Sequence, residues 1–289
     1  MSDPLKPSPA DEAKAAHVRR AIRTELDAGA VAPAGAAVPS ETESHETPVV
    51  QLEHVSLAFT EPVLEDVSIT ARAGETVVIV GESGTGKSTL LKLLLRLLRP
   101  DVGRVLVDGE DITDVGFNEA LKIRQKMGMV FQGAALFDSL DVFENVAFPL
   151  REHTDLDEDA IAARVREKLQ FVDLNPDQIS SLLPAELSGG MRKRVGIARG
   201  MANNARIMLY DEPTSGLDPL TTGTITRLIM KLQHELSVTS VVVTHDIRAA
   251  NRMASAIALL HDHHITFFGT PEEMAASDDP YIRDFLGGS

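Results

Sequence analysis

The sequence TVVIVGESGTGKSTLLKLLLRLL at residues 76–98 contains three different patterns in series. It begins with a short run of valine and isoleucine, residues 76–80, whose length and composition are typical of a buried strand. A glycine-rich loop follows, and residues 89–98 have the length and leucine content of a buried helix. A strand that enters a helix through a glycine-rich loop predicts the core of an α/β sheet.

The loop at residues 81–88, GESGTGKS, matches the phosphate-binding pattern G-x-x-x-x-G-K-[ST] in full. Glycines let backbone amides curl around phosphate oxygens without a clash from Cβ, and the following helix directs its N-terminal amides at the same anion. Lys87 would reach the β- and γ-phosphates, and Ser88 would place its hydroxyl on Mg²⁺. The residues predicted to bind the nucleotide here are Gly81, Glu82, Ser83, Gly84, Thr85, Gly86, Lys87, Ser88 and Thr89.

Two further segments have the composition of partners for such a loop. The apolar residues 207–210 lead into Asp211 and Glu212. Asp211 suits a Mg²⁺ ligand, directly or through water, and Glu212 suits a general base or a water-orienting group. Leu-Ser-Gly-Gly at residues 187–190 precedes a predicted helix at residues 191–202, so it offers a second helix N-terminus to a phosphate. Each segment alone would also fit an ordinary turn or cap, and the phosphate-binding loop favours the functional interpretation.

The bulk composition excludes several classes of protein. The chain of 289 residues has no cysteine, which excludes disulfides, thiolate metal ligands and a thiol nucleophile. Its formal net charge of −15 argues against broad affinity for nucleic acid, and we expect no nucleic-acid partner. The most apolar stretch, residues 90–98, is interrupted by Lys92 and Arg96 and is about half the roughly 20 residues that a membrane span requires. We therefore expect any spanning helices to belong to a partner.

Residues 1–48 differ in composition from the rest of the chain, because Ala, Pro, Ser and acidic residues dominate them. This composition predicts a disordered N-terminal extension. A docking helix for a partner is the alternative, since residues 11–27 would place four apolar side chains roughly on one helix face. Those side chains are Ala15, Val18, Ile22 and Leu26.

From residue 49 the pattern becomes globular, and we assign residues 49–289 to one domain. Strands are predicted at residues 49–59, 68–73, 76–80, 104–107, 127–131, 206–210 and 240–244. Helices are predicted at residues 89–98, 157–171, 191–202 and 222–236. Strands that alternate with helices predict an α/β fold with a mainly parallel sheet, and a helical block at residues 133–187 would be inserted between its strands.

The order of these segments resembles the ATPase domain of ABC transporters. The segments are residues 81–88, Gln132, residues 187–190, Asp211-Glu212, residues 215–218 and His245. The resemblance extends from about residue 49 to the C-terminus. It implies a P-loop NTPase core with a mainly parallel sheet, an antiparallel β subdomain and an inserted helical subdomain at about residues 133–190. It also implies hydrolysis of ATP with Mg²⁺.

The resemblance implies that the working unit is a dimer. In this family the signature segment of one subunit closes over ATP that the phosphate-binding loop of the other subunit holds. Ser188, Gly189 and Gly190 would therefore act in trans, and Asp218 would lie at the seam between the subunits.

The resemblance also implies roles for residues that the spacing leaves open. Gln132 would couple the nucleotide site to the membrane partner, and His245 would contact the γ-phosphate. Phe59 is the candidate for an aromatic ring that stacks on adenine, and a Phe in the core of the predicted strand is the alternative. The implied catalytic residues are Lys87, Gln132, Glu212 and His245. The implied metal ligands are Ser88, Gln132 and Asp211.

Three local features narrow the resemblance to the Mla-type and Mce-associated phospholipid transporters of bacteria. Met191 follows the signature where most relatives have Gln, residues 133–150 read GAALFDSLDVFENVAFPL, and residues 268–274 read FGTPEEM. The resemblance implies an ATPase that powers phospholipid transport at the cytoplasmic side of the bacterial inner membrane. Its partners would be a permease, a second copy of itself and an Mce-domain substrate-binding protein. The ATPase of an amino-acid or ion importer and a soluble ABC ATPase are the alternatives.

Two other stretches leave a choice between a site and plain structure. The segment after Gln132 would line a groove for a permease helix, or it would belong to the core of the helical subdomain. Its apolar residues are Ala134, Leu136, Phe137, Leu140, Val142, Phe143 and Val146. The sequence HDHH at residues 261–264 would suit a metal, but its position between two predicted strands favours a surface hairpin.

Overall fold

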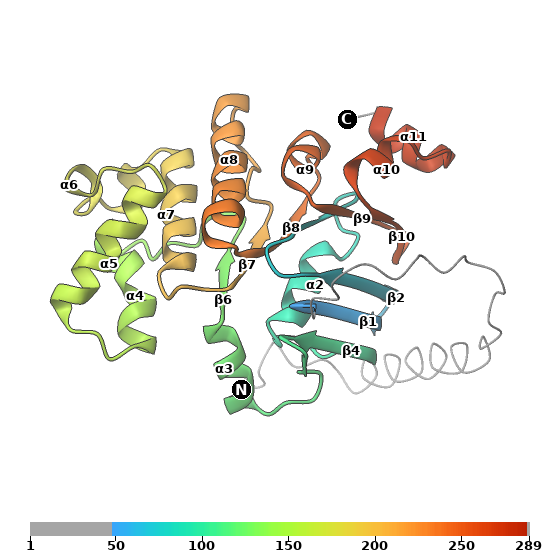
Figure 1. Ribbon diagram of the computed structural model, residues 1–289, viewed down its shortest axis with the longest axis horizontal. Coiled ribbons are helices and arrows are strands. Elements are labelled where there is room, and N and C mark those ends of the chain that lie inside the picture. Colours follow the sequence, from blue (N-terminus) through green and yellow to red (C-terminus); the bar gives the residue numbers. More distant parts are fainter. Residues whose placement is uncertain (1–47, 288–289) are drawn as a thin grey trace, which may run out of the picture.

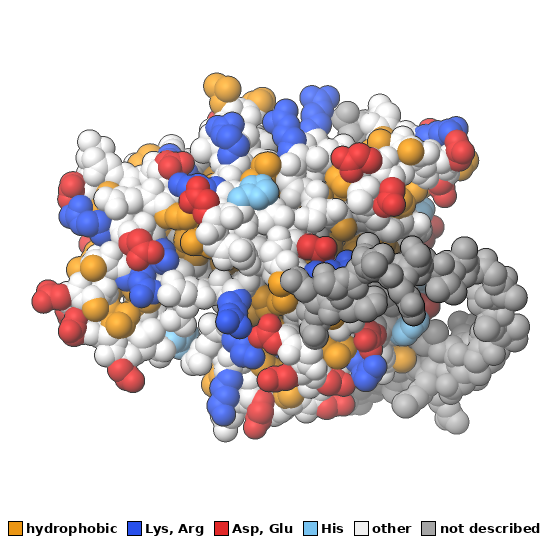
Figure 2. Space-filling view, in the orientation of Figure 1, with side chains coloured by type: hydrophobic (Ala, Val, Ile, Leu, Met, Phe, Trp, Pro, Cys, Tyr) orange, Lys and Arg blue, Asp and Glu red, His pale blue; other side chains and the backbone are white. Residues whose placement is uncertain are grey.

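The computed structural model describes residues 48–287, and Figure 1 shows how their helices and strands are arranged. The predicted N-terminal extension, including the apolar helix face at residues 11–27, lies outside the described residues. Within residues 48–287 no helix combines the length and the apolar character that crossing a membrane demands. On the face in Figure 2, acidic and basic side chains are interspersed over the described surface.

A six-stranded sheet, in the order β10-β9-β3-β8-β7-β6, forms the centre of the molecule. Its strands are β3 (Thr76–Val80), β6 (Met127–Val130), β7 (Ile207–Asp211), β8 (Thr239–Thr244), β9 (Ala256–His261) and β10 (His264–Gly269). All neighbouring pairs are parallel except β9 with β10. The loops that follow β3, β6, β7 and β8 therefore meet at one edge of the sheet, where open α/β folds bind ligands.

A second, antiparallel sheet has the order β2-β1-β4-β5. Its strands are β1 (Val50–Ala58), β2 (Pro62–Ala71), β4 (Val102–Val107) and β5 (Glu110–Asp111). A turn at Asp108-Gly109 joins β4 to β5, and Asp108 has a positive φ of 51°. This sheet supplies the antiparallel part of the predicted α/β fold.

Four helices form a separate lobe on the left of Figure 1. They are α4 (Val142–His153), α5 (Glu158–Phe171), α6 (Pro176–Ile179) and α7 (Gly189–Met201), with a 3-10 turn at Pro184–Glu186. The lobe interrupts the sequence between β6 and β7, two strands that pair directly in the sheet. The remaining helices are α2 (Lys87–Leu94), α3 (Phe117–Gln125), α8 (Pro219–Leu236), α9 (Ile247–Met253), α10 (Pro271–Ala275) and α11 (Pro280–Gly287).

The central sheet is covered by apolar side chains on both of its faces. Val77 and Ile79 of β3 belong to the core shared with α2 and the antiparallel sheet. Val78 and Val80 belong to the core shared with the helical lobe and α8. Alternate residues of a strand point to opposite faces, so a strand buried on both faces must be apolar throughout. The valine-rich run of the sequence reflects this double burial.

The leucine-rich helix is shorter than the prediction for residues 89–98. It begins at Lys87 and ends at Leu94, and Arg96 then adopts a positive φ of 54°. The buried guanidinium of Arg96 donates from Nε to the carbonyl of Ile112 at 3.0 Å. The helix therefore ends where a long-range contact holds the chain in a turn.

The segment after Gln132 is mostly core. Ala134, Val142 and Val146 are buried, and Leu136 and Phe143 pack partly buried against the same core. Phe137 remains 43% exposed.

Asn145 fixes this segment in place. Its side chain is fully buried, donates to the carbonyls of Phe137, Leu140 and Asp141 at 2.9–3.1 Å, and accepts from the amide of Phe137 at 2.8 Å.

The histidine-rich stretch forms the predicted hairpin. β9 and β10 pair antiparallel, with Asp262 and His263 in the turn at positive φ. The His261 ring stacks on Tyr281 of α11 with centroids 3.7 Å apart, and His264 Nε2 lies 3.1 Å from a carboxylate oxygen of Glu65. These contacts give the histidines a structural role in packing α11 and β2 against the hairpin.

Candidate nucleotide site

The glycine-rich loop connects β3 to α2 at the carboxyl edge of the central sheet. Gly81, Gly84 and Gly86 have φ values of 155°, 87° and 99°. A Cβ on Gly81 would lie 2.3 Å from the carbonyl oxygen of Leu260, and one on Gly86 would lie 2.9 Å from the Val63 side chain. Glycine is therefore required at both ends of the loop. The loop wraps in front of the amino end of α2, where backbone amides favour an anion.

Lys87, the first residue of α2, holds the loop together. Its side chain is buried, and its ammonium donates to the carbonyls of Gly81 at 2.8 Å and Glu82 at 2.6 Å. Burial lowers the pKa of Lys87, and the nearby carboxylates of Glu212 and Asp211 oppose that shift. The ammonium is thus largely shielded from solvent, and its attraction for an anion is stronger there than at an exposed position.

The two predicted carboxylates follow β7 and take different partners. The Ser88 hydroxyl donates to Oδ1 of Asp211 at 2.8 Å, which joins the loop to the end of β7. Glu212 has a positive φ of 47°, a conformation that costs a non-glycine residue roughly 1–3 kcal/mol and occurs often at functional sites.

The Glu212 carboxylate, which is only 13% exposed, lies 3.0 Å from Nδ1 of His245 and accepts from the Thr244 hydroxyl at 3.3 Å. The chain is strained at this residue, and its neighbours orient its carboxylate.

Gln132 approaches the site from the end of β6. Its side-chain amide lies 3.3 Å from the hydroxyl of Ser215, on the loop that follows β7. The backbone carbonyl of Gln132 accepts a short hydrogen bond from Lys193, and Lys193 also donates to the carbonyl of Glu212 at 3.1 Å. A single buried ammonium from α7 therefore ties the Gln132 segment to the Glu212 segment.

These side chains surround one pocket of about 380 Å³. Eight residues predicted from the phosphate-binding and carboxylate motifs line it, together with Gln132 and His245. The full lining is Ser83, Gly84, Gly86, Lys87, Ser88, Thr89, Gln132, Asp211, Glu212 and His245. Segments as far apart in the sequence as Ser83 and His245 thus converge at the edge where β3, β6, β7 and β8 end.

The signature residues and Asp218 lie outside this pocket. Ser188 caps α7 by accepting from the Met191 amide at 3.2 Å. Asp218 caps α8, and hydrogen bonds from Thr221 lower the pKa of its carboxyl group. A Cβ on Gly190 would lie 2.5 Å from the Thr221 side chain, so the starts of α7 and α8 are in close contact. The two helix starts form a second, exposed group.

Phe59 follows β1 and also lies outside the pocket. Its side chain is 47% exposed, so it is not the core Phe that the sequence left as an alternative. Its exposure leaves the ring accessible to a planar ligand.

Sequence reasoning missed Lys193 and Thr244 as site residues. Thr244 ends a strand directly before His245, and its contact with Glu212 depends on the pairing of β7 with β8. Lys193 lies on the buried face of α7 together with Ile197 and Met201. A lysine at helical spacing from buried apolar residues is the signal that would have identified it, because buried ammonium groups need partners.

The donors at this site fit a magnesium ion. Mg²⁺ prefers hard oxygen ligands and is bound in proteins through one or two carboxylates together with phosphate oxygens. The Ser88 hydroxyl and the Asp211 carboxylate are already in contact, and the Gln132 amide lines the same pocket. None of these three side chains carries a sulfur atom or an imidazole ring as a metal ligand.

Comparisons with known proteins agree with this geometry. A family model described as ABC transporter matches residues 64–215. The chain is 44% identical over 224 residues to the probable ribonucleotide transport ATP-binding protein mkl of Mycobacterium leprae, which covers 78% of this chain and 64% of that protein. The chain thus spans less than two thirds of the length of that relative. It is 39% identical over 226 residues to the intermembrane phospholipid transport system ATP-binding protein MlaF of Escherichia coli K12, which covers 78% of this chain and 83% of that protein.

Solved structures have the same fold. The dimeric post-hydrolysis state of the ATP-binding cassette MJ0796, bound to ADP and Pi, superposes with a TM-score of 0.70 at 36% identity, over 77% of this chain and 98% of that one. The structure of cbiO1 from Clostridium perfringens, part of the ABC transporter complex cbiONQ, gives a TM-score of 0.74 at 28% identity, over 83% and 95%. The phosphate-binding loop, the paired carboxylates and these matches together establish that the chain belongs to the ABC transporter family, as an ATP-binding domain.

Proposed function

We propose that this chain is the ATP-hydrolysing subunit of a membrane transporter whose cargo is phospholipid. The observation that carries the hydrolysis is the Glu212 carboxylate, which His245 and Thr244 orient beside the phosphate-binding loop. The 39% identity to a protein named for intermembrane phospholipid transport supports the cargo.

The proposed chemistry follows from the partners of each side chain. Lys87 and the loop amides would hold the β- and γ-phosphates, and His245 would contact the γ-phosphate. Ser88, Asp211 and Gln132 would hold Mg²⁺, which when bound neutralises charge on the phosphate oxygens. Glu212 would accept a proton from the attacking water, or orient that water. Lys193 would keep Gln132 and Glu212 at a fixed separation through their carbonyls.

The position of the signature supports a dimer as the working unit. Ser188, Gly189 and Gly190 do not line the pocket that holds Lys87, and they are accessible at the start of α7 together with Asp218. A second copy of the chain would present its signature to the nucleotide, with Asp218 at the seam. The dimeric structure of a relative with 36% identity supports this arrangement.

A groove beside the nucleotide site suits a helix of the permease. It has a volume of about 310 Å³ and lies between β6, α4 and the end of α7. Phe131, Phe137 and Phe148, which line it, are each 41–43% exposed. Exposed aromatic side chains in a groove are typical anchors for an amphipathic helix.

Arg199 makes this groove rigid. Its guanidinium donates to the carbonyls of Ala134 and Ala135 at 2.7–2.9 Å and lies over the Phe137 ring. Phe131 immediately precedes Gln132, so a helix bound in the groove would be one residue away from the nucleotide pocket.

We further propose that the chain acts at the cytoplasmic side of the bacterial inner membrane, bound to it through the permease. An Mce-domain substrate-binding protein would complete the transporter. The support is the resemblance of residues 133–150 and 268–274 to the ATPases of Mla-type and Mce-associated systems.

Identification of the cargo tests this function. The tagged chain would be purified with its membrane partners in detergent, and the extract analysed by mass spectrometry for lipids and nucleotides. We expect a permease and enriched phospholipid relative to bulk membrane. A complex that carries ribonucleotide, which the name of the 44% identical mycobacterial protein would suggest, or another small solute, would overturn the phospholipid proposal. Recovery of no membrane protein would overturn the transporter proposal.

A further inference from the structure

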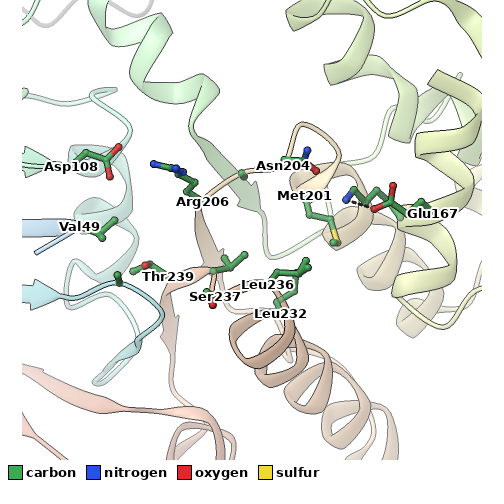
Figure 3. A pocket seen from close by; sticks show the side chains of 14 residues that line it. Val49, Asp108, Glu167, Met201, Asn204, Arg206, Leu232, Leu236, Ser237 and Thr239 are labelled. Carbon is green, nitrogen blue, oxygen red and sulfur yellow. Dashed lines mark hydrogen bonds and ion pairs between the residues drawn. The ribbon is translucent and has the colours of Figure 1, made fainter. Parts of the chain in front are cut away.

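A pocket of about 530 Å³ lies at the amino ends of β7 and β8, whereas the nucleotide site lies at their carboxyl ends. Figure 3 shows its lining residues, which include residues from the helical lobe, from α8, from β8 and from the segment just before β1. Met201 and Glu167 belong to the lobe, Leu232 and Leu236 to α8, and Val49 precedes β1. The transport function proposed above uses none of these residues.

The interior of this pocket is apolar and its mouth is charged. Met201, Leu232 and Val238 are buried around it, while Leu236 remains 47% exposed. Glu167, which pairs with the buried Lys168, is 61% exposed at the mouth. A concave apolar surface with charged groups at its edge is typical of a site for the apolar face of a helix.

The described chain begins at this pocket. Val49 lines it, and 47 residues precede the first described residue. Residues 28–47 are enough to form a linker, since a flexible chain of that length has an end-to-end distance of about 25 Å. A segment attached through such a linker has an effective concentration in the millimolar range, so even a weak site would be occupied.

The segment before that linker has a matching pattern. Residues 11–27 read DEAKAAHVRRAIRTELD, and a helix there would place Ala15, Val18, Ile22 and Leu26 roughly on one face. Arg19 and Arg23 would lie beside that face, where they would meet the carboxylate of Glu167. We propose that residues 11–27 dock as a helix in this pocket of their own chain, with the apolar face toward Leu232 and Leu236.

The docked segment would join two parts of the molecule. Glu167 and Met201 belong to the helical lobe, whereas Thr239 begins β8 of the central sheet and Val49 directly precedes β1 of the antiparallel sheet. A helix that contacts both would restrain the lobe relative to the sheets.

Disulfide trapping tests the proposal directly, because the natural chain has no cysteine. Val18→Cys would be combined with Leu236→Cys in the full chain, which would then be oxidised mildly. We expect a disulfide within one chain, visible as a faster-migrating monomer on a non-reducing gel. Thr24→Cys with Leu236→Cys is the control for the helix face, since residue 24 lies opposite residues 18 and 22 on a helix. Val18→Cys with Leu220→Cys is the control for place, because Leu220 lies at the other end of α8 and is 84% exposed.

Two outcomes of this trapping would overturn the proposal. One is a disulfide yield no higher than in the two controls, and the other is a disulfide between two chains, which would assign the pocket to a second copy.

Maleimide labelling gives a second measurement that needs no bond between the two sites. Leu236→Cys alone should react about ten-fold faster when Val18→Asp and Ile22→Asp are added, because an occupied site shields the thiol. The same additions should leave the labelling of Leu220→Cys unchanged. Equal rates for Leu236→Cys with and without the two aspartates would show that the segment does not cover the pocket.

Discussion

Glu212 combines a strained backbone with an oriented carboxylate, which is the arrangement expected of a group that acts on water. Its φ of 47° is maintained by the surrounding chain, and His245 and Thr244 hold its carboxylate. Replacing Glu212 with Gln keeps the shape but removes the proton acceptor. We expect ATP turnover to fall by about 10²–10⁴-fold while ATP binding is retained. Measurement of phosphate release and of nucleotide binding would test this, with Glu110→Gln on the exposed β5 as the control. Turnover at the natural rate in Glu212→Gln would remove Glu212 from the mechanism.

Lys193 is a positioning residue whose role follows from its two carbonyl partners, Gln132 and Glu212. Burial lowers its pKa, and the carboxylates of Glu212 and Asp211 oppose this shift. Lys193→Met would fill the same volume and leave both carbonyls without that donor. We expect kcat to fall about ten-fold, with a smaller change in KM for ATP, because a loss of about 1.4 kcal/mol in transition-state stabilisation corresponds to that factor. Lys122→Met, at an exposed position on α3, is the control. An unchanged kcat in Lys193→Met would contradict the positioning role.

The contrast between Lys87 and Lys193 shows what can be predicted from the sequence at the residue scale. Lys87 belongs to a continuous motif whose chemistry is local, so eight adjacent residues are enough to assign it. Lys193 acts on a carbonyl 61 positions away, and its partners become neighbours only through the packing of α7 on β6. Its role therefore depends on tertiary contacts that no local pattern contains.

At the scale of elements, β6 and α7 touch through two glycines. A Cβ on Gly128 would lie 2.2 Å from the carbonyl oxygen of Gly200 and 2.3 Å from the sulfur of Met208. Gly128→Ala must therefore push the helical lobe away from the sheet, and we expect a loss of about 1–3 kcal/mol of unfolding free energy or more. Gly133→Ala is the matched control, since a Cβ there would meet no atom within 4 Å. Urea unfolding of both variants checks the prediction, and equal midpoints would contradict the close approach.

The elements that were predicted correctly are those with a strong local pattern. β3 is buried on both faces and must be apolar throughout, so its five residues match the prediction. The prediction of where α2 ends was wrong, because Arg96 turns the chain through a contact with Ile112, which is distant in the sequence. The predicted groove after Gln132 was placed by apolarity alone, which does not distinguish the buried Val142 from the exposed Phe137.

At the scale of the whole molecule, the aromatic groove should hold the permease. Phe148 is 41% exposed and packs against Phe137 with centroids 4.9 Å apart. Phe148→Asp would place a charge in the groove without touching the nucleotide pocket. We expect association with the permease to weaken about 30-fold or more, since an interface hot spot contributes about 2 kcal/mol or more, and ATP binding to be unchanged. Phe117→Asp, which alters a 71% exposed Phe on α3, is the control. Co-purification of the permease at the natural yield would assign its docking site elsewhere.

We expect two copies of the chain to complete each nucleotide site, because within one copy the signature does not reach the pocket of the phosphate-binding loop. Two heterodimers with the same pair of substitutions distinguish a signature that acts on the nucleotide of the other copy from one that acts on the nucleotide of its own copy. Tandem affinity tags would isolate each heterodimer with its permease. One contains Lys87→Ala in one copy and Ser188→Arg in the other. The second heterodimer contains both substitutions in one copy and none in the other.

Measurement of ATP turnover in these two heterodimers tests the account most directly. If the signature acts in trans, the first heterodimer keeps one intact site of two and should retain about half of the natural turnover. The second should then be nearly inactive, because each of its sites contains one defect. The reverse result, an inactive first heterodimer and a half-active second one, would show that each chain completes its own site and would contradict the account.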